Sequence, residues 1–175
     1  MKSINIDRNS EDVFYRYKMP EIEVKIEGRG NGIKTVLVNI EDIAKSLDRD
    51  PKYITKYLSY DLGTLSSVDE TNSKYIINGS HTSEKVQSCI FKFIEEFILC
   101  KSCERNPETV LFTDANRRHI QQRCKACGKI NTIKTQNKLG KILLKELPDK
   151  AESDRLEPQD FEDIDDFEVD YAFGK

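Results

Sequence analysis

Cys100-Lys101-Ser102-Cys103 and Cys124-Lys125-Ala126-Cys127 are the two stretches that decide the fold of this chain. In each, two residues separate a pair of cysteines, and residues 104–123 lie between the pairs. A Cys-x-x-Cys turn places two thiolates on one side of a metal ion, and a hairpin of about twenty residues brings the second pair to the opposite side. Four free thiols or two disulfides fit this spacing less well. The sequence therefore predicts a four-cysteine zinc ribbon with one structural zinc ion, because four thiolates leave no coordination position for water or substrate; the ligands are Cys100, Cys103, Cys124 and Cys127.

The chain has 175 residues, enough for one ordinary domain or for two small ones that share a core. It contains no signal peptide, no long apolar run and no lipidation motif. We therefore expect a soluble, cytoplasmic protein with no membrane partner, in a compartment where thiols stay reduced and a cysteine quartet indicates metal. The fifth cysteine, Cys89, lies in an apolar helical pattern, which favours a buried core thiol.

The formal net charge of −3 conceals two oppositely charged parts of the chain. Residues 151–175 carry ten acidic and two basic side chains, a net charge of −8, which leaves +5 for residues 1–150. A basic body favours contact with nucleic acid or phosphate, although four zinc-bound thiolates would offset part of that charge. Acidic residues and regularly placed aromatics fill residues 160–173, a composition too polar to fold alone. We expect an acidic, disordered tail over residues 149–175 that docks onto a basic protein partner.

The first segment, residues 1–20, is predicted to be an N-terminal arm. It lacks a helical apolar period, and Pro20 disfavours helix at Met19. In an extended chain Tyr15 and Tyr17 point to one side and Arg16 to the other. The simplest interpretation is a surface arm whose tyrosines pack on the body while the arginine is solvated.

Residues 21–97 are predicted to form a small mixed α/β domain. Strict alternation over 22–27 and β-branched residues over 33–40 indicate two paired strands, and 66–69 with 74–77 indicate a second hairpin. Apolar residues at helical spacing predict two helices after the first hairpin and a third helix after the second.

The caps of these helices are also predicted from the sequence. Asp50 caps the second helix, with Pro51 at its first position and Gly63 as its stop. Ser80 or Thr82 caps the third helix, which continues into the ribbon and should make the two halves one rigid unit.

Gly28-Arg29-Gly30-Asn31-Gly32 lies between the first two strands and holds three of the eight glycines of the chain. A hairpin turn with positive φ explains this composition. The same turn could in addition bring its backbone close to a phosphate, aided by Arg29 and Lys34, and the spacing alone leaves this contact open. The segment is not a Walker loop, because the full spacing and the Lys-Ser/Thr pair are absent.

Residues 98–148 are predicted to form the zinc ribbon and a closing helix. Short strands are expected over 109–114 and 118–123, and a helix over 137–147 ends at Pro148. The ribbon is rich in arginine and lysine, and either a solvated surface or contact with nucleic acid explains this.

Four segments carry a resemblance to a known family. They are Phe14-Tyr15-Arg16-Tyr17-Lys18-Met19-Pro20, Gly28-Arg29-Gly30-Asn31-Gly32-Ile33-Lys34-Thr35, Tyr75-Ile76-Ile77-Asn78-Gly79-Ser80-His81 and Cys124-Lys125-Ala126-Cys127-Gly128. Over about residues 3–148 the chain resembles the N-terminal domain of the eukaryotic translation initiation factor 5 family. The order of elements also fits a relative, the beta subunit of initiation factor 2, but the Tyr-Arg-Tyr-Lys-Met-Pro arm favours factor 5. The resemblance implies an α+β fold in which an α/β domain resembling initiation factor 1 is fused through a helix to the ribbon.

The resemblance also implies a function. Members of the family activate GTP hydrolysis by initiation factor 2 and are not enzymes by themselves. Arg16 would act in trans on GTP held by the gamma subunit, with Lys34 and Lys56 in support. The loop from Gly28 to Gly32 would approach initiator tRNA and the small ribosomal subunit. Family members usually continue into a C-terminal helical-repeat domain, whereas this chain stops at Lys175, so a fragment and a reduced natural form are both open.

Two other functions fit parts of the pattern. The chain could be a beta-subunit-like structural component of initiation factor 2 with no activating role. It could also be a transcription factor, because the helices predicted around Asp48-Arg49-Asp50 resemble a helix-turn-helix and precede a zinc ribbon. Lys52 and Lys56 lie one turn apart on the outer side of the second helix, where solvation is the simplest interpretation.

Overall fold

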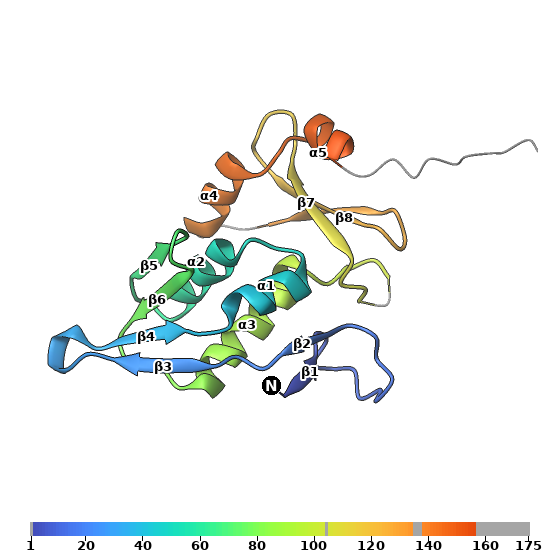
Figure 1. Ribbon diagram of the computed structural model, residues 1–175. Coiled ribbons are helices and arrows are strands. Elements are labelled where there is room, and N and C mark those ends of the chain that lie inside the picture. The colour runs from blue at the N-terminus through green and yellow to red at the C-terminus, as the bar shows by residue number, and fades with distance from the viewer. Residues whose placement is uncertain (1, 104, 135–137, 157–175) are drawn as a thin grey trace, which may run out of the picture.

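Three antiparallel sheets organise the described part of the chain, which comprises residues 2–103, 105–134 and 138–156 of a computed structural model (Figure 1). The first sheet pairs β1 (Ser3–Asn5) with β2 (Lys18–Pro20). The second has the strand order β3–β4–β6–β5, and the third has the order β7–β8–β9. Five α-helices accompany these sheets in the described residues. The α+β class predicted from the sequence is therefore confirmed.

The four-stranded sheet belongs to the α/β domain, and helix α2 (Pro51–Asp61) packs on one of its faces. Its strands are β3 (Val24–Glu27), β4 (Lys34–Leu37), β5 (Ser66–Asp69) and β6 (Lys74–Asn78). In β4, the side chains of Thr35 and Leu37 are buried. Their partners in β6, Ile77 and Tyr75, are buried as well. Period-two alternation thus gives the sheet one largely apolar face, on which helix α2 packs.

Three helices of the α/β domain follow the predicted pattern closely. They are α1 (Ile40–Leu47), α2 (Pro51–Asp61) and α3 (Ser83–Phe97). Asp50 caps α2 by accepting the backbone N–H of Lys52 at 2.8 Å, and Pro51 occupies the first helical position. Thr82, not Ser80, is the cap of α3. Helix starts are local events, which is why the sequence predicts them well.

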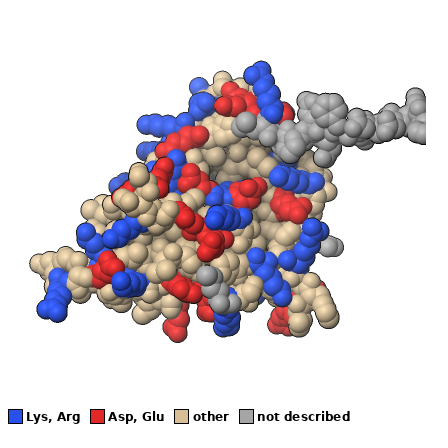
Figure 2. All heavy atoms as spheres, viewed as in Figure 1, with Lys and Arg blue, Asp and Glu red and all other residues tan. Residues whose placement is uncertain are grey.

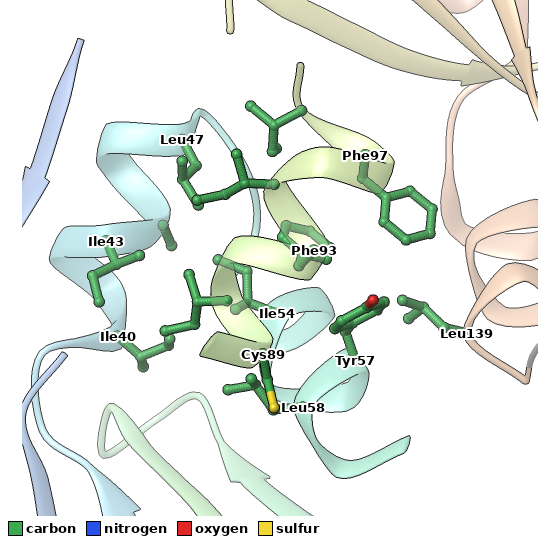
Figure 3. Packing of buried hydrophobic residues seen from close by; sticks show 14 of the residues in the cluster. Ile40, Ile43, Leu47, Ile54, Tyr57, Leu58, Cys89, Phe93, Phe97 and Leu139 are labelled. Atoms are coloured by element: carbon green, nitrogen blue, oxygen red, sulfur yellow. The ribbon is translucent and has the colours of Figure 1, made fainter. Parts of the chain in front are cut away.

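The apolar faces of these helices meet in one core (Figure 3). Tyr57 of α2 packs edge-on against Phe93 and Phe97 of α3, with ring centroids 5.3 Å and 5.9 Å apart. Leu139, from a helix that follows the ribbon, points toward Tyr57 from the other side (Figure 3). Cys89 is buried within this core, as predicted.

The ribbon contains three strands and is closed by helices. Its elements are β7 (Thr109–Thr113), β8 (Ile120–Cys124), β9 (Ile130–Ile133), α4 (Lys138–Glu146) and α5 (Lys150–Leu156). The sequence predicted the first two strands and α4 but not β9. The acidic tail was expected from residue 149, whereas the structure continues as α5 through Leu156. The tail residues 157–175 lie outside the described residues.

The ribbon caps the end of α3. The Thr109 hydroxyl donates to the Ile98 carbonyl at 2.6 Å. The buried Gln122 amide donates to the carbonyls of Phe97 and Ile98 at 3.2 Å and 3.0 Å. Arg49, from the turn between α1 and α2, reaches the Thr109 hydroxyl at 3.0 Å. Carbonyls at a helix C-terminus lack partners within the helix, so these ribbon and turn side chains satisfy them and join the two halves.

Candidate functional site: the metal centre and the N-terminal arm

The four predicted zinc ligands converge at the start of the ribbon. Their sulfur atoms all lie within 4.8 Å of one another. The Sγ atoms of Cys100 and Cys127 are 3.8 Å apart, and those of Cys103 and Cys124 are 3.7 Å apart. A tetrahedron with Zn–S bonds of about 2.3 Å has S···S edges of about 3.8 Å. The cluster therefore fits one zinc ion, which would supply structural cross-linking when bound.

Neighbouring groups orient the first cysteine for this role. The backbone N–H of Ser102 donates to the Cys100 sulfur at 3.4 Å, and the Asn131 amide approaches the same sulfur at 3.9 Å. Burial opposes ionisation of Cys100, but hydrogen bonds from the N–H groups of Ser102 and Cys103 and from the thiols of Cys103 and Cys124 bring its pKa down to about 7. Burial raises the pKa of Cys103 to about 12 and also raises that of Cys124, so the first thiolate of the cluster forms at Cys100. A thiol with a lowered pKa is suited to bind metal as a thiolate.

The N-terminal arm is folded against the body through its two-stranded sheet. In this sheet Ile4 lies opposite Met19, and beyond it the Ile6 N–H donates to the Tyr17 carbonyl at 3.0 Å. Ile6 and Met19 are 2% and 1% exposed and belong to the main core. Both ends of the arm are thus anchored by apolar burial.

A second anchor ties the arm to the loop of the first cysteine pair. Asp7 accepts two hydrogen bonds from Arg105, from Nε at 2.7 Å and from Nη2 at 3.1 Å. Glu95 of α3 extends the group, because its Oε1 lies 3.1 Å from Arg8 Nε and 3.7 Å from Arg105 Nη2. Arm, ribbon and α3 meet at this cluster of charges.

Arg16 is presented on the outside of the anchored arm. Tyr15 and Tyr17 are half-buried and pack edge-on at 5.8 Å, whereas the side chain of Arg16 is exposed. The Arg16 guanidinium carbon lies 5.7 Å from the centre of the Tyr17 ring. The two tyrosines line a cavity of about 490 Å³ between the arm and the ribbon loop, together with Arg105 and Asn106. The predicted division, with tyrosines inward and arginine outward, matches this arrangement.

The glycine loop lies at the opposite end of the molecule from the arm (Figure 1). It joins β3 to β4 and includes a 3₁₀ turn over Gly30–Gly32. Gly28 has φ +92°, and a Cβ there would lie 2.2 Å from the Gly32 carbonyl oxygen, so the turn requires glycine. All five residues from Gly28 to Gly32 are exposed, as is Lys34 at the start of β4. The hairpin-turn interpretation is correct, and the loop remains free to contact a partner.

Lys56 lies in a third location, against α4. Its Nζ is 3.8 Å from Glu146 Oε1, and Lys52 Nζ is 3.3 Å from the other oxygen of the same carboxylate. The outer lysines of α2 are therefore paired with α4 and are not merely solvated. Because α2 is packed between the sheet, α3 and α4, it is not placed as the recognition helix of a helix-turn-helix.

The comparisons with known proteins identify the family of this chain. Residues 7–130 match the family model for a domain found in initiation factors 2B and 5. The chain belongs to this initiation factor family. It is 46% identical over 151 residues to eukaryotic translation initiation factor 5 of Pongo abelii, covering 86% of this chain and 35% of that protein. The corresponding protein of Saccharomyces cerevisiae is 45% identical over 150 residues, covering 85% of this chain and 36% of that protein.

This family member spans about a third of the length of the curated relatives that it matches. The match to translation initiation factors confirms the resemblance inferred from the arm, the glycine loop and the cysteine pairs. In the described residues, no helix is both long and apolar enough to span a membrane.

Three candidate residues of this initiation factor family member do not form one site. Arg16 is on the arm, Lys34 follows the glycine loop and Lys56 faces α4. The sequence analysis did not identify Asp7 and Arg105, whose hydrogen bonds hold the arm against the ribbon. A single aspartate and a single arginine that lie far apart in the chain form no recognisable motif. Only the position of Arg105 two residues after a zinc ligand could have drawn attention to it.

Proposed function

We propose that this chain is a GTPase-activating translation initiation factor. It promotes GTP hydrolysis by initiation factor 2 bound to initiator tRNA on the small ribosomal subunit during start-codon recognition. In this proposal the chain acts in the cytoplasm and supplies Arg16 in trans to GTP on the gamma subunit. The main support is that Arg16 is exposed on an arm that the Asp7–Arg105 hydrogen bonds hold against the body, in a chain of this family.

The chemistry of the guanidinium suits this role. Arginine stays charged at all physiological pH values and offers a planar set of donors to phosphate oxygens. An arginine delivered in trans accelerates GTP hydrolysis by about 10³- to 10⁵-fold where it stabilises charge in the transition state. An anchored arm loses little freedom when the arginine engages, because Tyr15 and Tyr17 already pack against the body.

The three candidate residues would act on different parts of the initiation complex, because they lie on different parts of the chain. Arg16 would act at the nucleotide, whereas Lys34 and Lys56 would support binding from other surfaces. The loop Gly28–Gly32 would contact initiator tRNA or the small subunit through its exposed backbone and Arg29. The zinc ion would hold the ribbon on which the arm rests, and residues beyond 156 would contact a basic partner.

Single-turnover GTP hydrolysis tests this proposal. Reconstituted initiation factor 2 with initiator tRNA on small subunits is mixed with no addition, with the wild-type chain, or with Arg16→Ala, at saturating concentrations. Arg118→Ala, at an exposed arginine of the ribbon, is the matched control. We expect wild type and Arg118→Ala to accelerate hydrolysis and Arg16→Ala to lose most of the acceleration.

Two results would overturn parts of the proposal. No acceleration by the wild-type chain, with stable binding to the gamma subunit that Arg16→Ala leaves intact, would assign the chain a structural role like that of the beta subunit. Acceleration that survives Arg16→Ala would keep the activator function and remove Arg16 from it.

A further inference from the structure

The tip of the arm exposes two large apolar side chains. Phe14 is 92% exposed and Val13 is 78% exposed, the highest values among the large hydrophobic residues that the structure describes. They lie in the loop between β1 and β2, which projects from the molecule at the lower right of Figure 1. Exposure of a whole phenylalanine in water is unfavourable, so its position requires an explanation.

The exposure is built into the loop. The Phe14 N–H donates to the Asp12 carboxylate at 2.8 Å, and the Tyr15 N–H donates to the Asp12 carbonyl at 3.1 Å. The Asn5 amide of β1 crosses the loop to the Ser10 carbonyl at 2.9 Å. The Lys18 ammonium reaches the Val13 carbonyl at 3.3 Å. These hydrogen bonds fix the backbone on both sides of Phe14, so the exposed ring extends from an ordered loop.

Phe14 and Arg16 are both exposed on the arm. The chain alternates there, with Phe14 and Arg16 exposed while Tyr15 and Tyr17 pack inward. An exposed aromatic ring and an exposed guanidinium therefore stand two residues apart on one hydrogen-bonded loop. Aromatic residues and arginine are enriched at the centres of protein interfaces.

We propose that Phe14, with Val13, is the anchor that docks the arm into an apolar pocket on the GTPase beside its nucleotide site. This inference rests on the proposed function and adds the means by which Arg16 is positioned. Burial of the ring supplies affinity, and the two-residue spacing then fixes where the guanidinium lies relative to the pocket. In this proposal Phe14 positions the arm, and Arg16 stabilises the negative charge that develops on the phosphate in the transition state.

The charges around Phe14 favour a protein surface over RNA as the partner. Surfaces that stack RNA bases combine aromatic rings with a basic groove that follows the phosphates. Here the two residues before Val13 are Glu11 and Asp12, both exposed. Acidic and basic side chains are also mixed over the face of the molecule seen in Figure 2.

The experiment compares Phe14→Ala with Leu65→Ala, a matched control at a leucine that is 75% exposed on the α/β domain. Binding to the isolated GTPase subunit, loaded with a non-hydrolysable GTP analogue, is measured by fluorescence anisotropy of the labelled chain. Single-turnover hydrolysis is then measured across a range of chain concentrations. Thermal unfolding checks that both variants fold, which the exposure of both side chains favours.

We expect Phe14→Ala to weaken binding and to raise the half-maximal concentration by on the order of 10- to 100-fold, the effect of losing one buried aromatic side chain. The maximal rate should fall as well, because the ring no longer fixes where the Arg16 guanidinium lies. Phe14→Leu should recover most of the affinity. Leu65→Ala should behave as the wild type does.

Three outcomes would overturn the inference. The first is that Phe14→Ala binds the GTPase with the affinity of the wild-type chain. The second is that Phe14→Ala lowers the maximal rate without shifting the half-maximal concentration. The third is that Phe14→Ala binds small subunits more weakly while its binding to the GTPase is unchanged. The last outcome would assign Phe14 to RNA. Failure of the proposed function appears differently, as no acceleration by the wild-type chain, and the binding measurement still decides the role of Phe14 in that case.

Discussion

Arg105 of the ribbon holds Asp7 of the arm in a paired hydrogen bond, although the two residues lie 98 positions apart in the sequence. Arg105 follows the first cysteine pair and has φ +54°, a left-handed backbone that is unusual for arginine. The Asn106 carbonyl accepts the N–H of Cys100 at 3.0 Å, so the same loop shapes the metal centre. The position of the arm is therefore linked to the metal centre through a few residues of one loop.

Loss of Arg105 should destabilise the chain and loosen the arm. Asp7 is 5% exposed, so Arg105→Ala would leave a nearly buried carboxylate without its main partner. We expect a loss of about 1–3 kcal/mol in the free energy of unfolding, measured by urea denaturation. The control is Arg8→Ala, which breaks an exposed ion pair with Glu95 and should cost no more than about 1 kcal/mol. Equal effects of the two variants would contradict this account.

Removal of zinc should release the arm as well as unfold the ribbon. Cys124→Ser should lose the single bound zinc ion and cost several kcal/mol of stability, because metal binding contributes directly to folding of such sites. Metal analysis gives the stoichiometry, and amide hydrogen exchange of residues 3–20 reports the arm. Cys89→Ala, at the cysteine outside the cluster, should keep one zinc ion per chain. Unchanged exchange in the arm after zinc loss would show that the two regions are independent.

Cys89 should make stability depend on pH in the alkaline range. Burial raises the pKa of Cys89 from 9.0 to about 11, helped by the hydrogen bond that the thiol donates to Asp61 and by the negative charge of that carboxylate. A group with a raised pKa stabilises the folded chain below its unfolded pKa, and that contribution is lost as the pH rises through the folded value. We expect the free energy of unfolding to fall between about pH 9 and 11 more steeply for wild type than for Cys89→Ala. Parallel profiles for the two proteins would contradict the shift.

The glycine loop should tolerate a side chain at one glycine far better than at another. Gly28→Ala would place a Cβ 2.2 Å from the Gly32 carbonyl oxygen at a φ of +92°, so the turn must distort. We expect a loss of about 1–3 kcal/mol for Gly28→Ala by thermal unfolding. Gly30→Ala is the control, because φ is +56° and no atom lies within 4 Å of its Cβ; it should cost about 1 kcal/mol. A smaller effect at Gly28 than at Gly30 would contradict the steric explanation.

Elements governed by neighbouring residues were predictable. The helix over Ile40–Leu47 follows from its apolar spacing, and the start of α2 follows from Asp50 and Pro51. The convergence of four cysteines follows from two Cys-x-x-Cys pairs at ribbon spacing, and their sulfur atoms do lie close enough to hold a metal ion. The roles expected of Arg16, Lys34 and Lys56 remain predictions, although the position of each is now known.

Contacts between distant segments were not predictable in the same way. Strand β9 has no strong alternation, and it forms because β8 offers it an edge. The pairing of Lys52 and Lys56 with Glu146 depends on how α4 packs on α2. A charged residue on a helix face has many potential partners, and only packing selects one.

The sequence by itself determined the family, the four cysteines of the candidate metal site and most helices and strands, because each depends on the type and spacing of residues within a short stretch of chain. Only the tertiary structure decided where the arm lies and that Phe14 and Arg16 are both exposed on it. That placement comes from burial of Ile6 and Met19 in the core and from the bond between Asp7 and Arg105. Such contacts join separated segments of the chain, so closing the intervening loops costs entropy and no local pattern of residues specifies them.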